Sequence, residues 1–545
     1  MNTATKLQPR IAPCRAACPA GVDVPRYVRQ IAEGRFTDAL ATIRERIPFP
    51  LVCGYACFHP CETKCGRAQF EGAVAIRMLK RAAAELGAGV PLPTALAKTG
   101  RKVAIVGSGP CGLTAAYYLA LLGHEVTVYE ALNRSGGMLR YGIPGYRLPD
   151  DVVDADIRLI EQCGVNIVTG KRVTAAEALL EEGYHAVLIA SGAWRPVTMG
   201  IPGERGANVI NGISFLEAVN AGGSPAIGAK VVIIGGGDTA IDAARASRRL
   251  GAQVAQLYRR TRAEMPASAE EIEAALEEGV SMEFLVAPLR IDKGVVTCTR
   301  MALGVPDETG RPRPEPIPKS EFKIAASTVI VAIGQSVDVP ARHVARTSSG
   351  TVRANAATLT TSVKDVFAGG DAVSGPASII DAIAQGRAAS AAIDRFLGGK
   401  GDLDRWTGTN ADIDRGESAP RGTARRPWQH IGAESRLGSF ALVECAYDTA
   451  SAMQEAARCL SCDRLAYEVK IDPALCKDCG YCKEVCALDV FTRSDDFNAS
   501  GYRPYAATQP QSCIGCLKCL YICPDFAITV SPAANAVSQP SALSG

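Results

Sequence analysis

The stretch Val103-Ala-Ile-Val-Gly107-Ser-Gly109-Pro-Cys-Gly112 decides the fold of the central part of this chain. Its first four residues form a short apolar run typical of a buried strand, and its glycines have the spacing G-x-G-x-x-G at the start of a helical segment. Such glycines allow a tight turn and let backbone N–H groups approach a pyrophosphate at the positive end of the helix. The stretch therefore predicts a βαβ unit that binds a nucleotide.

The segment that follows supplies the acid that such a unit needs. Residues 125–129 form a second apolar strand pattern and end at Glu130, eighteen residues after Gly112. A carboxylate at this position accepts hydrogen bonds from the ribose of an adenosine. Short apolar strands alternate with helical segments from Lys102 to about residue 400. This alternation predicts an α/β fold built on parallel sheets.

A second nucleotide motif, Gly235-Gly-Gly237-Asp238-Thr239-Ala240, follows the apolar run 231–234. Ala240 replaces the last glycine, a change that close helix–strand packing tolerates. The next predicted strand, 253–258, ends in a basic turn rather than an acid, with Arg259, Arg260 and Arg262. Cations there favour the 2′-phosphate of NADP(H). The alternative is that the basic turn is only a solvated surface loop and that the site binds NAD(H).

Sixteen of the twenty cysteines fall into short-spaced groups at the two ends of the chain. Near the C-terminus the spacing C-x2-C-x2-C-x3-C occurs twice, as in a bacterial ferredoxin with two iron–sulfur clusters. In that fold the fourth cysteine of each run ligates the other cluster. The predicted ligands are Cys476, Cys479, Cys482 and Cys523 for one cluster, and Cys513, Cys516, Cys519 and Cys486 for the other.

Two further segments carry a family resemblance. The run that begins Gly136-Gly137-Met138 and ends Arg147-Leu-Pro149, together with the later Ala368-Gly-Gly370-Asp371, resembles the flavin segments of the small (β) subunit of glutamate synthase. Relatives of that subunit include dihydropyrimidine dehydrogenase and bifurcating NADPH:ferredoxin transhydrogenases. The resemblance spans about residues 10–395 and implies that the first nucleotide is FAD. The FAD contacts that it implies are Gly107, Ser108, Gly109, Pro110, Gly112, Glu130, Gly137, Met138, Arg147, Gly370 and Asp371, with an ordinary surface arginine as the alternative for Arg147.

The two nucleotide units are predicted to be nested Rossmann-like domains. An FAD-binding domain at 99–222 and 330–400 is interrupted by an NAD(P)H-binding domain at 223–329, and Gly334 marks the crossover back. Around them we expect a helical iron–sulfur domain at 1–98, a connector at 401–466, a ferredoxin-like α+β domain at 467–530 and a disordered tail at 531–545.

The resemblance also implies two 4Fe–4S clusters in the N-terminal domain. In the family a C-x2-C pair opens this domain, but no such pair precedes Cys14. The run Cys459-Leu-Ser-Cys462, which lies after the flavin domain, has the same sequence pattern as the missing pair. We therefore hypothesise that one cluster uses Cys14, Cys65, Cys459 and Cys462 and joins the two ends of the chain. The alternative is that Cys459 and Cys462 are spare thiols on a linker.

The second N-terminal cluster would use Cys18, Cys57 and Cys61. Some members of the family supply its fourth ligand from a Gln or Glu in the following helix, and that position is Lys80 here. A protonated lysine cannot ligate iron. The substitutes in the sequence are Glu71, Gln69 and Cys53, and an altered or absent cluster also stays open.

Composition excludes several classes of function. The chain has 545 residues, of which 47% are apolar and 21% charged, and its net charge of +3 gives no field that would recruit nucleic acid or an anionic membrane. No apolar run is long enough to span a membrane. Grouped cysteines indicate metal ligands in a reducing cytoplasm rather than disulfides. We expect no catalytic side-chain constellation, because the cofactors carry the hydride and electron chemistry.

These motifs and the family resemblance together imply an NAD(P)H:acceptor oxidoreductase that contains FAD, NADP(H) and up to four 4Fe–4S clusters. Its partner would be ferredoxin or the catalytic subunit of a larger complex, such as a 2-oxoacid or aldehyde oxidoreductase. Two alternatives stay open: the small subunit of an NADPH-dependent glutamate synthase, and a non-enzymatic iron–sulfur scaffold. The direction of electron flow depends on cluster potentials, which a sequence does not give.

Overall fold

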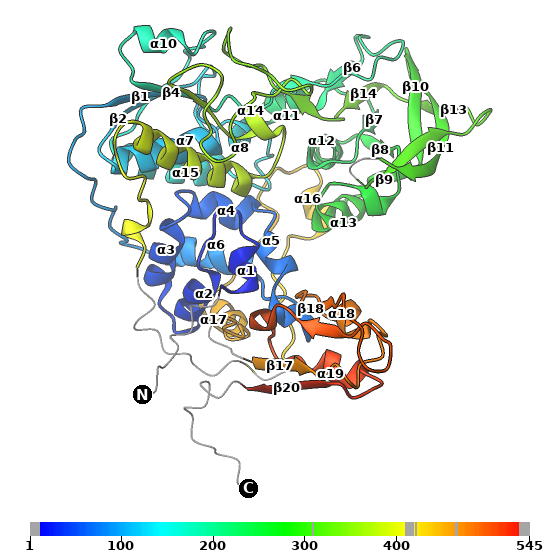
Figure 1. Ribbon diagram of the computed structural model, residues 1–545. Coiled ribbons are helices and arrows are strands. Elements are labelled where there is room, and N and C mark those ends of the chain that lie inside the picture. The colour runs from blue at the N-terminus through cyan, green and yellow to red at the C-terminus, as the bar shows by residue number, and fades with distance from the viewer. Residues whose placement is uncertain (1–10, 308–309, 409–418, 420–421, 464–466, 533–545) are drawn as a thin grey trace.

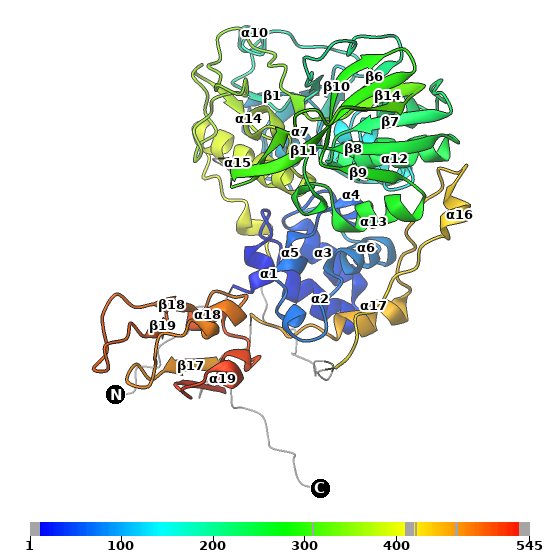
Figure 2. The same cartoon turned by 90° about the vertical axis from the view of Figure 1, so that its right-hand side faces the viewer.

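The computed structural model describes residues 11–307, 310–408, 419, 422–463 and 467–532. The units form three tiers (Figures 1 and 2). The N-terminal helices form the middle tier; both nucleotide-binding sheets lie on one side of it, and the C-terminal unit lies on the other. The predicted tail lies outside the described residues from 533 onward. No helix of the described residues is long and apolar enough to cross a membrane.

The N-terminal tier is a bundle of short helices. Asp23 caps the first long helix, because its carboxylate accepts a hydrogen bond from the Arg26 amide, and apolar side chains such as Ile31 and Ile43 are fully buried. The elements are α1 (Pro13–Ala16), α2 (Val24–Ala32), α3 (Phe36–Arg44), α4 (Pro50–Ala56), α5 (Pro60–Thr63), a 3-10 turn (Gly66–Gln69) and α6 (Ile76–Leu86). Helices α4 and α6 pack closely at Gly54, where a Cβ atom would lie 2.7 Å from the Cα of Arg81.

The first nucleotide-binding sheet is parallel throughout, in the order β16-β4-β1-β2-β3. Its strands are β1 (Lys102–Val106), β2 (Glu125–Tyr129), β3 (Asn166–Val168), β4 (Ala186–Ile189) and β16 (Val366–Ala368). Its helices are α7 (Pro110–Leu121), α8 (Met138–Tyr141), α9 (Asp150–Gln162), α10 (Ala178–Glu181), α14 (Asp371–Ser374) and α15 (Ile379–Phe396). Helices α7 and α15 pack side by side. They approach so closely at Gly386 that a Cβ atom there would overlap the carbonyl oxygen of Cys111.

The second parallel sheet has the order β6-β14-β7-β8-β9. Its strands are β6 (Val209–Asn211), β7 (Lys230–Ile234), β8 (Gln253–Tyr258), β9 (Ser281–Phe284) and β14 (Thr328–Val331), and its helices are α11 (Gly212–Asn220), α12 (Asp238–Arg249) and α13 (Ala269–Glu277). An antiparallel sheet adjoins it, with β10 (Val286–Asp292), β11 (Val295–Pro306), β12 (Pro312–Pro316) and β13 (Phe322–Ala325). The short strands β5 (Arg195–Pro196) and β15 (Gln335–Ser336) pair where the chain crosses between the two parallel sheets.

The predicted fold class is confirmed, and the strands expected at 103–106, 125–129, 231–234 and 253–258 are present. Helix α7, which follows the first glycine turn, begins at Pro110, since a proline fits the first turn of a helix. Strand β6 belongs to the second sheet although it precedes residue 223, where the sequence puts the start of the NAD(P)H-binding domain. The division into domains stays a proposal. The place of β6 in the second sheet favours a start of the NAD(P)H-binding domain near Val209.

The connector packs against the N-terminal tier. Its elements are a 3-10 turn (Asp404–Trp406), α16 (Ala433–Arg436) and α17 (Thr449–Ala456), and α17 contacts α2 and α6. The fully buried Arg458 donates to the carbonyl oxygen of Gly72 at 2.8 Å and to that of Thr423 at 3.0 Å. The Ala75 amide donates to Glu455 at 2.8 Å. The segment that carries Cys459 and Cys462 is thus fixed against residues 72–75.

The C-terminal tier contains two antiparallel strand pairs. Strand β17 (Tyr467–Ile471) pairs with β20 (Ile528–Pro532), and β18 (Phe491–Arg493) pairs with β19 (Tyr505–Ala507). Two short helices, α18 (Tyr481–Val485) and α19 (Lys518–Ile522), each contain the third cysteine of a run, Cys482 and Cys519.

Candidate functional site

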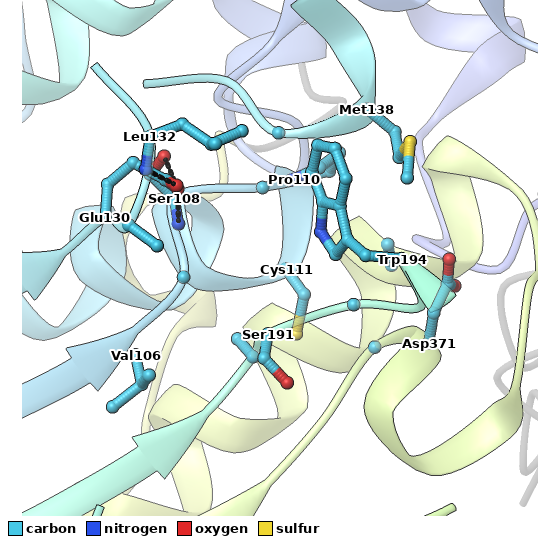
Figure 3. A pocket seen from close by; sticks show the side chains of 18 of the residues that line it. Val106, Ser108, Pro110, Cys111, Glu130, Leu132, Met138, Ser191, Trp194 and Asp371 are labelled. Carbon is cyan, nitrogen blue, oxygen red and sulfur yellow. Dashed lines mark hydrogen bonds between the residues drawn. The ribbon is translucent and has the colours of Figure 1, made fainter. Parts of the chain in front are cut away.

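A large cavity opens at the carboxyl ends of β1, β2 and β4 and has a volume of about 510 Å³. Figure 3 shows its lining side chains, which come from the first glycine turn, the end of β2 and the segment around Asp371. All but two of the predicted FAD contacts line it: Gly107, Ser108, Gly109, Pro110, Glu130, Gly137, Met138, Gly370 and Asp371. Gly112 and Arg147 do not.

The glycines of the first turn differ in what surrounds them. A Cβ atom at Gly112 would overlap the carbonyl oxygen of Gly107, so Gly112 permits close packing of α7 on β1. Gly107 has φ of 109° and lies against Ala190. A Cβ atom at Gly109 would meet no atom within 4 Å, because this residue faces the open cavity. The cavity thus leaves room for a pyrophosphate beside the N-terminus of α7.

Glu130 is held in a fixed orientation at the end of β2. Its Oε2 accepts hydrogen bonds from the Ser108 amide at 3.1 Å and the Ser108 hydroxyl at 2.6 Å, and its Oε1 accepts from the Leu132 amide at 2.8 Å. Each carboxylate oxygen has two lone pairs, so Oε1 retains capacity to accept from one hydroxyl of a ribose.

Ser191 and Trp194 also line this cavity, although the sequence motifs did not indicate them. The Oγ atom of Ser191 is buried, and no hydrogen-bond partner for it occurs within the described residues. Trp194 projects into the cavity (Figure 3). Its ring packs edge-on against that of Tyr141, with ring centroids 6.0 Å apart. Both follow β4, whose end adjoins that of β1. A polar residue two positions after a buried strand was the signal that could have found Ser191. Its unpaired hydroxyl and the open face of Gly109 fit a polar ligand such as FAD.

Asp371 lies at the start of α14, and its Oδ1 accepts from the Ala377 amide at 3.2 Å. Burial raises the pKa of Asp371 to about 6. Gly370 precedes it with φ of 67°, in the left-handed region that favours glycine. The carboxyl group is therefore oriented by backbone contacts at the cavity wall.

Arg147 lies in a different environment from the one that the resemblance implies. Its Nη1 atom is 2.7 Å from Oδ2 of Asp242 on α12, and its Nε atom is 3.1 Å from Oε1 of Glu271 on α13. These partners belong to the second nucleotide unit. The structure places Arg147 in a mostly buried ion-pair network between the two units and outside the cavity lined by Gly109.

The second glycine motif forms a turn of the same kind. A Cβ atom at Gly235 would overlap the carbonyl oxygen of Ala332, and Ala240 is fully buried. Asp238 accepts from the Ser268 amide at 3.2 Å, and Gln335 donates to the Thr239 hydroxyl at 3.4 Å. The nearest atom to a Cβ at Gly237 would be 3.8 Å away, so this face of the turn is open. Gly334 has φ of 128° at the crossover.

The three arginines after β8 differ in their availability. Arg260 is buried, and its Nε donates to the carbonyl oxygen of Pro312 at 2.8 Å. Arg262 pairs with Glu273. Arg259 is exposed, and no ion pair engages it in the described part of the chain. Of the three, Arg259 is the one whose charge is free to meet a phosphate.

Four cysteines from both ends of the chain line one small cavity: Cys14, Cys65, Cys459 and Cys462. The pKa of the Cys14 thiol is raised by burial and further by Cys459, Cys65 and Cys462, which shows how close these groups are. The structure thus brings together the four residues that the hypothesis assigns to one cluster. The assignment itself stays a prediction.

The C-terminal cysteines also gather in the crossed arrangement. Cys482 is surrounded by Cys476, Cys479 and Cys523, which add to the effect of burial in raising its pKa to about 11. Cys519 is surrounded by Cys513, Cys516 and Cys486, and all four of these line one cavity together with Gln69.

No group of three or more His, Cys, Asp or Glu side chains could hold a metal ion within the described residues. A 4Fe–4S cluster differs from an ion in this respect, because each of its cysteines binds a different iron and the four sulfur ligands lie farther apart. The grouped cysteines therefore fit clusters better than single ions.

Comparison with known proteins assigns each tier. Residues 101–386 match the family model described as pyridine nucleotide-disulphide oxidoreductase. The chain belongs to this family. Residues 5–88 match dihydropyrimidine dehydrogenase domain II, 4Fe-4S cluster, and residues 475–532 match the 4Fe-4S dicluster domain.

Three curated relatives agree with this assignment. NADPH-Fe(3+) oxidoreductase subunit beta of Geobacter sulfurreducens is 40% identical over 84% of this chain and 75% of its own length. NADP(+)-dependent formate dehydrogenase subunit beta of Moorella thermoacetica is 38% identical over 84% of this chain and 71% of its own. Glutamate synthase [NADPH] small chain of Azospirillum brasilense is 34% identical over 71% of this chain and 87% of its own.

The predicted resemblance to the small subunit of glutamate synthase is therefore confirmed. The chain is an oxidoreductase whose cofactors are FAD, NADP(H) and 4Fe–4S clusters. The residues that hold these groups remain predictions, and Gly109, Glu130 and the grouped cysteines are the best supported by their surroundings.

Proposed function

We propose that this chain is the NADP(H)-linked subunit of a larger redox complex, and that it exchanges electrons with a catalytic partner subunit or ferredoxin through its C-terminal tier. The observation that carries this proposal is the row of cysteine groups that begins under the FAD-binding unit and ends at the exposed surface of the C-terminal tier. FAD, when bound, exchanges hydride with NADP(H) and single electrons with iron–sulfur clusters.

The row begins beneath the first nucleotide-binding sheet. Helix α4 contacts α9 and α15 of that unit, and the Val52 amide donates to Asp156 on α9 at 2.9 Å. Cys57 directly follows α4. The group of Cys18, Cys57 and Cys61 is therefore the N-terminal group closest to the FAD-binding unit.

The two N-terminal groups adjoin each other. Tyr27 is fully buried, and Cys61, Cys14 and Cys18 all add to burial in raising the pKa of its hydroxyl, so this ring lies between the two groups. The Tyr27 hydroxyl donates to the carbonyl oxygen of Ile76 at 3.4 Å. The tyrosine is a rigid packing element between neighbouring cysteine groups.

The N-terminal and C-terminal tiers meet at a glycine. A Cβ atom at Gly66 would lie 3.1 Å from both the Sγ atom of Cys462 and a methyl group of Ile514. Lys518 donates to Gln69 at 3.3 Å across the same contact, and Cys516 packs against the N-terminal core. This close approach supports electron transfer between the Cys14 group and the group that contains Cys513 and Cys516.

The far end of the row is exposed. Cys479 lies at the surface, and the side chains of Tyr521 and Phe526 beside Cys523 are 80% and 83% exposed. Apolar side chains around a redox group at the surface favour contact with a protein partner. The names of the Geobacter and Moorella relatives, both beta subunits, support an assembly of this kind.

We propose a 2-oxoacid or aldehyde oxidoreductase as one class of complex, and a cytoplasmic location because grouped thiols persist in a reducing compartment. The small-chain relative of glutamate synthase makes that complex the second candidate. The separate match at residues 475–532 favours the first candidate, since a minimal small subunit lacks this unit.

Anaerobic addition of NADPH to the purified chain tests the proposal. We expect the flavin absorbance to bleach within the dead time of manual mixing, and more slowly with NADH. Failure of both nucleotides to bleach the bound flavin would refute the proposal and favour the iron–sulfur scaffold. Purification from the native cell then identifies the partner by the subunits that accompany this chain.

A further inference from the structure

The second N-terminal group contains a buried cation that is unlike its neighbours. Helix α6 carries three buried cationic side chains, Arg77, Lys80 and Arg81. Arg77 donates to both oxygens of Glu444 at 2.7 Å, and Arg81 donates to Glu85 at 2.7 Å. In the described part of the chain, no carboxylate forms an ion pair with Lys80.

The neighbours of the Lys80 ammonium are thiols. Lys80 is 4% exposed, and the groups with the strongest electrostatic effect on it are Cys57, Cys53, Cys61 and Cys18. Removal of an ammonium ion from water is strongly unfavourable unless an anion lies beside it. Neutral thiols are weak acceptors and supply no such charge, whereas thiolates bound to iron do. The buried lysine therefore indicates that this pocket of cysteines is anionic in the mature protein.

Cys53 belongs to this pocket by position and by burial. It lies one helical turn before Cys57, so both side chains lie on one face of the α4 segment. Cys53 is fully buried, and it belongs to the same core as Cys18, Cys57 and Cys61. Gly54 beside it forms the close contact with α6 at Arg81, the residue next to Lys80. The packing of α4 on α6 thus fixes Cys53 next to the ammonium.

The other substitutes for a fourth ligand are engaged elsewhere. Glu71 accepts from Nε of Arg67 at 2.7 Å and from its Nη2 at 3.2 Å. Gln69 accepts from Lys518 and lines the cavity of the C-terminal cysteines. Both therefore have partners outside the group of Cys18, Cys57 and Cys61.

We propose that Cys53 is the fourth ligand of the second N-terminal cluster, and that the ammonium of Lys80 offsets part of the negative charge of that cluster without binding iron. This inference rests on the proposed assignment of Cys18, Cys57 and Cys61 as the other ligands. It makes the second cluster an all-cysteine one, and it explains why a cation occupies the position of the family's Gln or Glu ligand.

Replacement of Cys53 tests the ligand. Cys53→Ser and Cys53→Ala are produced anaerobically as the full chain, with Cys298→Ala as the control because Cys298 is equally buried, in strand β11, and belongs to no group. We expect both Cys53 variants to lose up to about a quarter of the iron and sulfide, the share of one cluster in four. Loss of a single iron would instead give the paramagnetic signal of an oxidised 3Fe–4S cluster. Full iron content with no new signal in both variants would overturn the proposal.

Lys80→Met tests the cation. It preserves the length of the side chain and removes its charge, so we expect full iron content and a more negative reduction potential for one cluster. Iron loss in Lys80→Met, with full iron in Cys53→Ser, would identify Lys80 as the ligand and overturn the proposal. Bleaching of the wild-type flavin by NADPH is recorded on the same preparations. A failure of the proposed function therefore appears in that measurement, and a failure of this inference appears in the iron content.

Discussion

Replacement of Arg147 by methionine distinguishes a structural role between the nucleotide units from a flavin contact. Arg147 bonds Asp242 at 2.7 and 2.9 Å, and the two side chains are only 13% and 4% exposed. Methionine fills similar space but leaves the Asp242 carboxylate buried without its cation. Glu271 is less affected, because it also pairs with Arg245.

The expected loss of stability follows from burial. Two unit charges about 4 Å apart attract each other by about 4 kcal/mol at an effective dielectric constant near 20, and removal of one partner from a buried pair typically costs about 3–5 kcal/mol. For a unit of this size the thermal midpoint should fall by roughly 10 °C. The control is Arg134→Met, because Arg134 pairs with Asp150 and Asp154 while 49% exposed. An exposed pair contributes less than about 1 kcal/mol.

The loss of stability in Arg147→Met should become smaller as pH falls. Burial raises the pKa of Asp242, and Arg147 opposes this rise. Without Arg147 the folded-state pKa of Asp242 rises further, so the difference in stability between wild type and variant is full at alkaline pH and disappears as pH falls through the wild-type pKa of about 6. The gap in midpoint between wild type and Arg147→Met should therefore narrow from pH 8 to pH 5. The double variant Arg147→Met/Asp242→Asn should recover most of the loss.

Differential scanning calorimetry and the ratio of FAD to protein are measured on the same samples. We expect a lowered midpoint with an unchanged flavin ratio. A variant that loses flavin at an unchanged midpoint would refute this reasoning and support the FAD contact that the family resemblance implies.

Three further variants test other parts of the account. Cys459→Ala should lose the iron of one cluster and keep the spectrum of the ferredoxin-like pair, and unchanged iron would show that Cys459 is a spare thiol. Gly66→Val places a branched side chain where even a Cβ atom lies 3.1 Å from Cys462 and Ile514, so electron delivery to an added acceptor should slow at least tenfold while NADPH still bleaches the flavin; an unaffected rate would remove this contact from the route. Arg259→Ala should raise KM for NADPH about tenfold, a loss of about 1.4 kcal/mol, and leave KM for NADH unchanged, whereas equal effects on both would exclude a contact with the 2′-phosphate.

Much of the fold was predictable because its signals are local. The strand–glycine–helix runs at Gly107 and Gly235 each combine hydrophobic period, turn chemistry and helix start within about fifteen residues. The pairing of Cys459 and Cys462 with Cys14 was predictable only by resemblance, since the residues lie more than 440 positions apart. The structure brings them together through Arg458 and Glu455.

Side-chain partners were the part that sequence patterns could not supply. Arg147 has the same neighbours in sequence whether it contacts a flavin or Asp242, and only the packing of α12 beside it decides. Arg260 was grouped with Arg259 by spacing, yet alternation along the chain buries one and exposes the other. Strand β6 extends the second sheet across an expected boundary because a parallel strand can join a sheet from a distant segment.

The most direct test of the account is the reduction of the C-terminal clusters by NADPH in the intact chain. Anaerobic protein is mixed with NADPH, frozen at intervals and examined by EPR, with the flavin absorbance followed in parallel. The account predicts that signals of reduced 4Fe–4S clusters, including the interacting pair of the ferredoxin-like tier, appear after the flavin bleaches. A flavin that bleaches while clusters reducible by dithionite stay oxidised would contradict it.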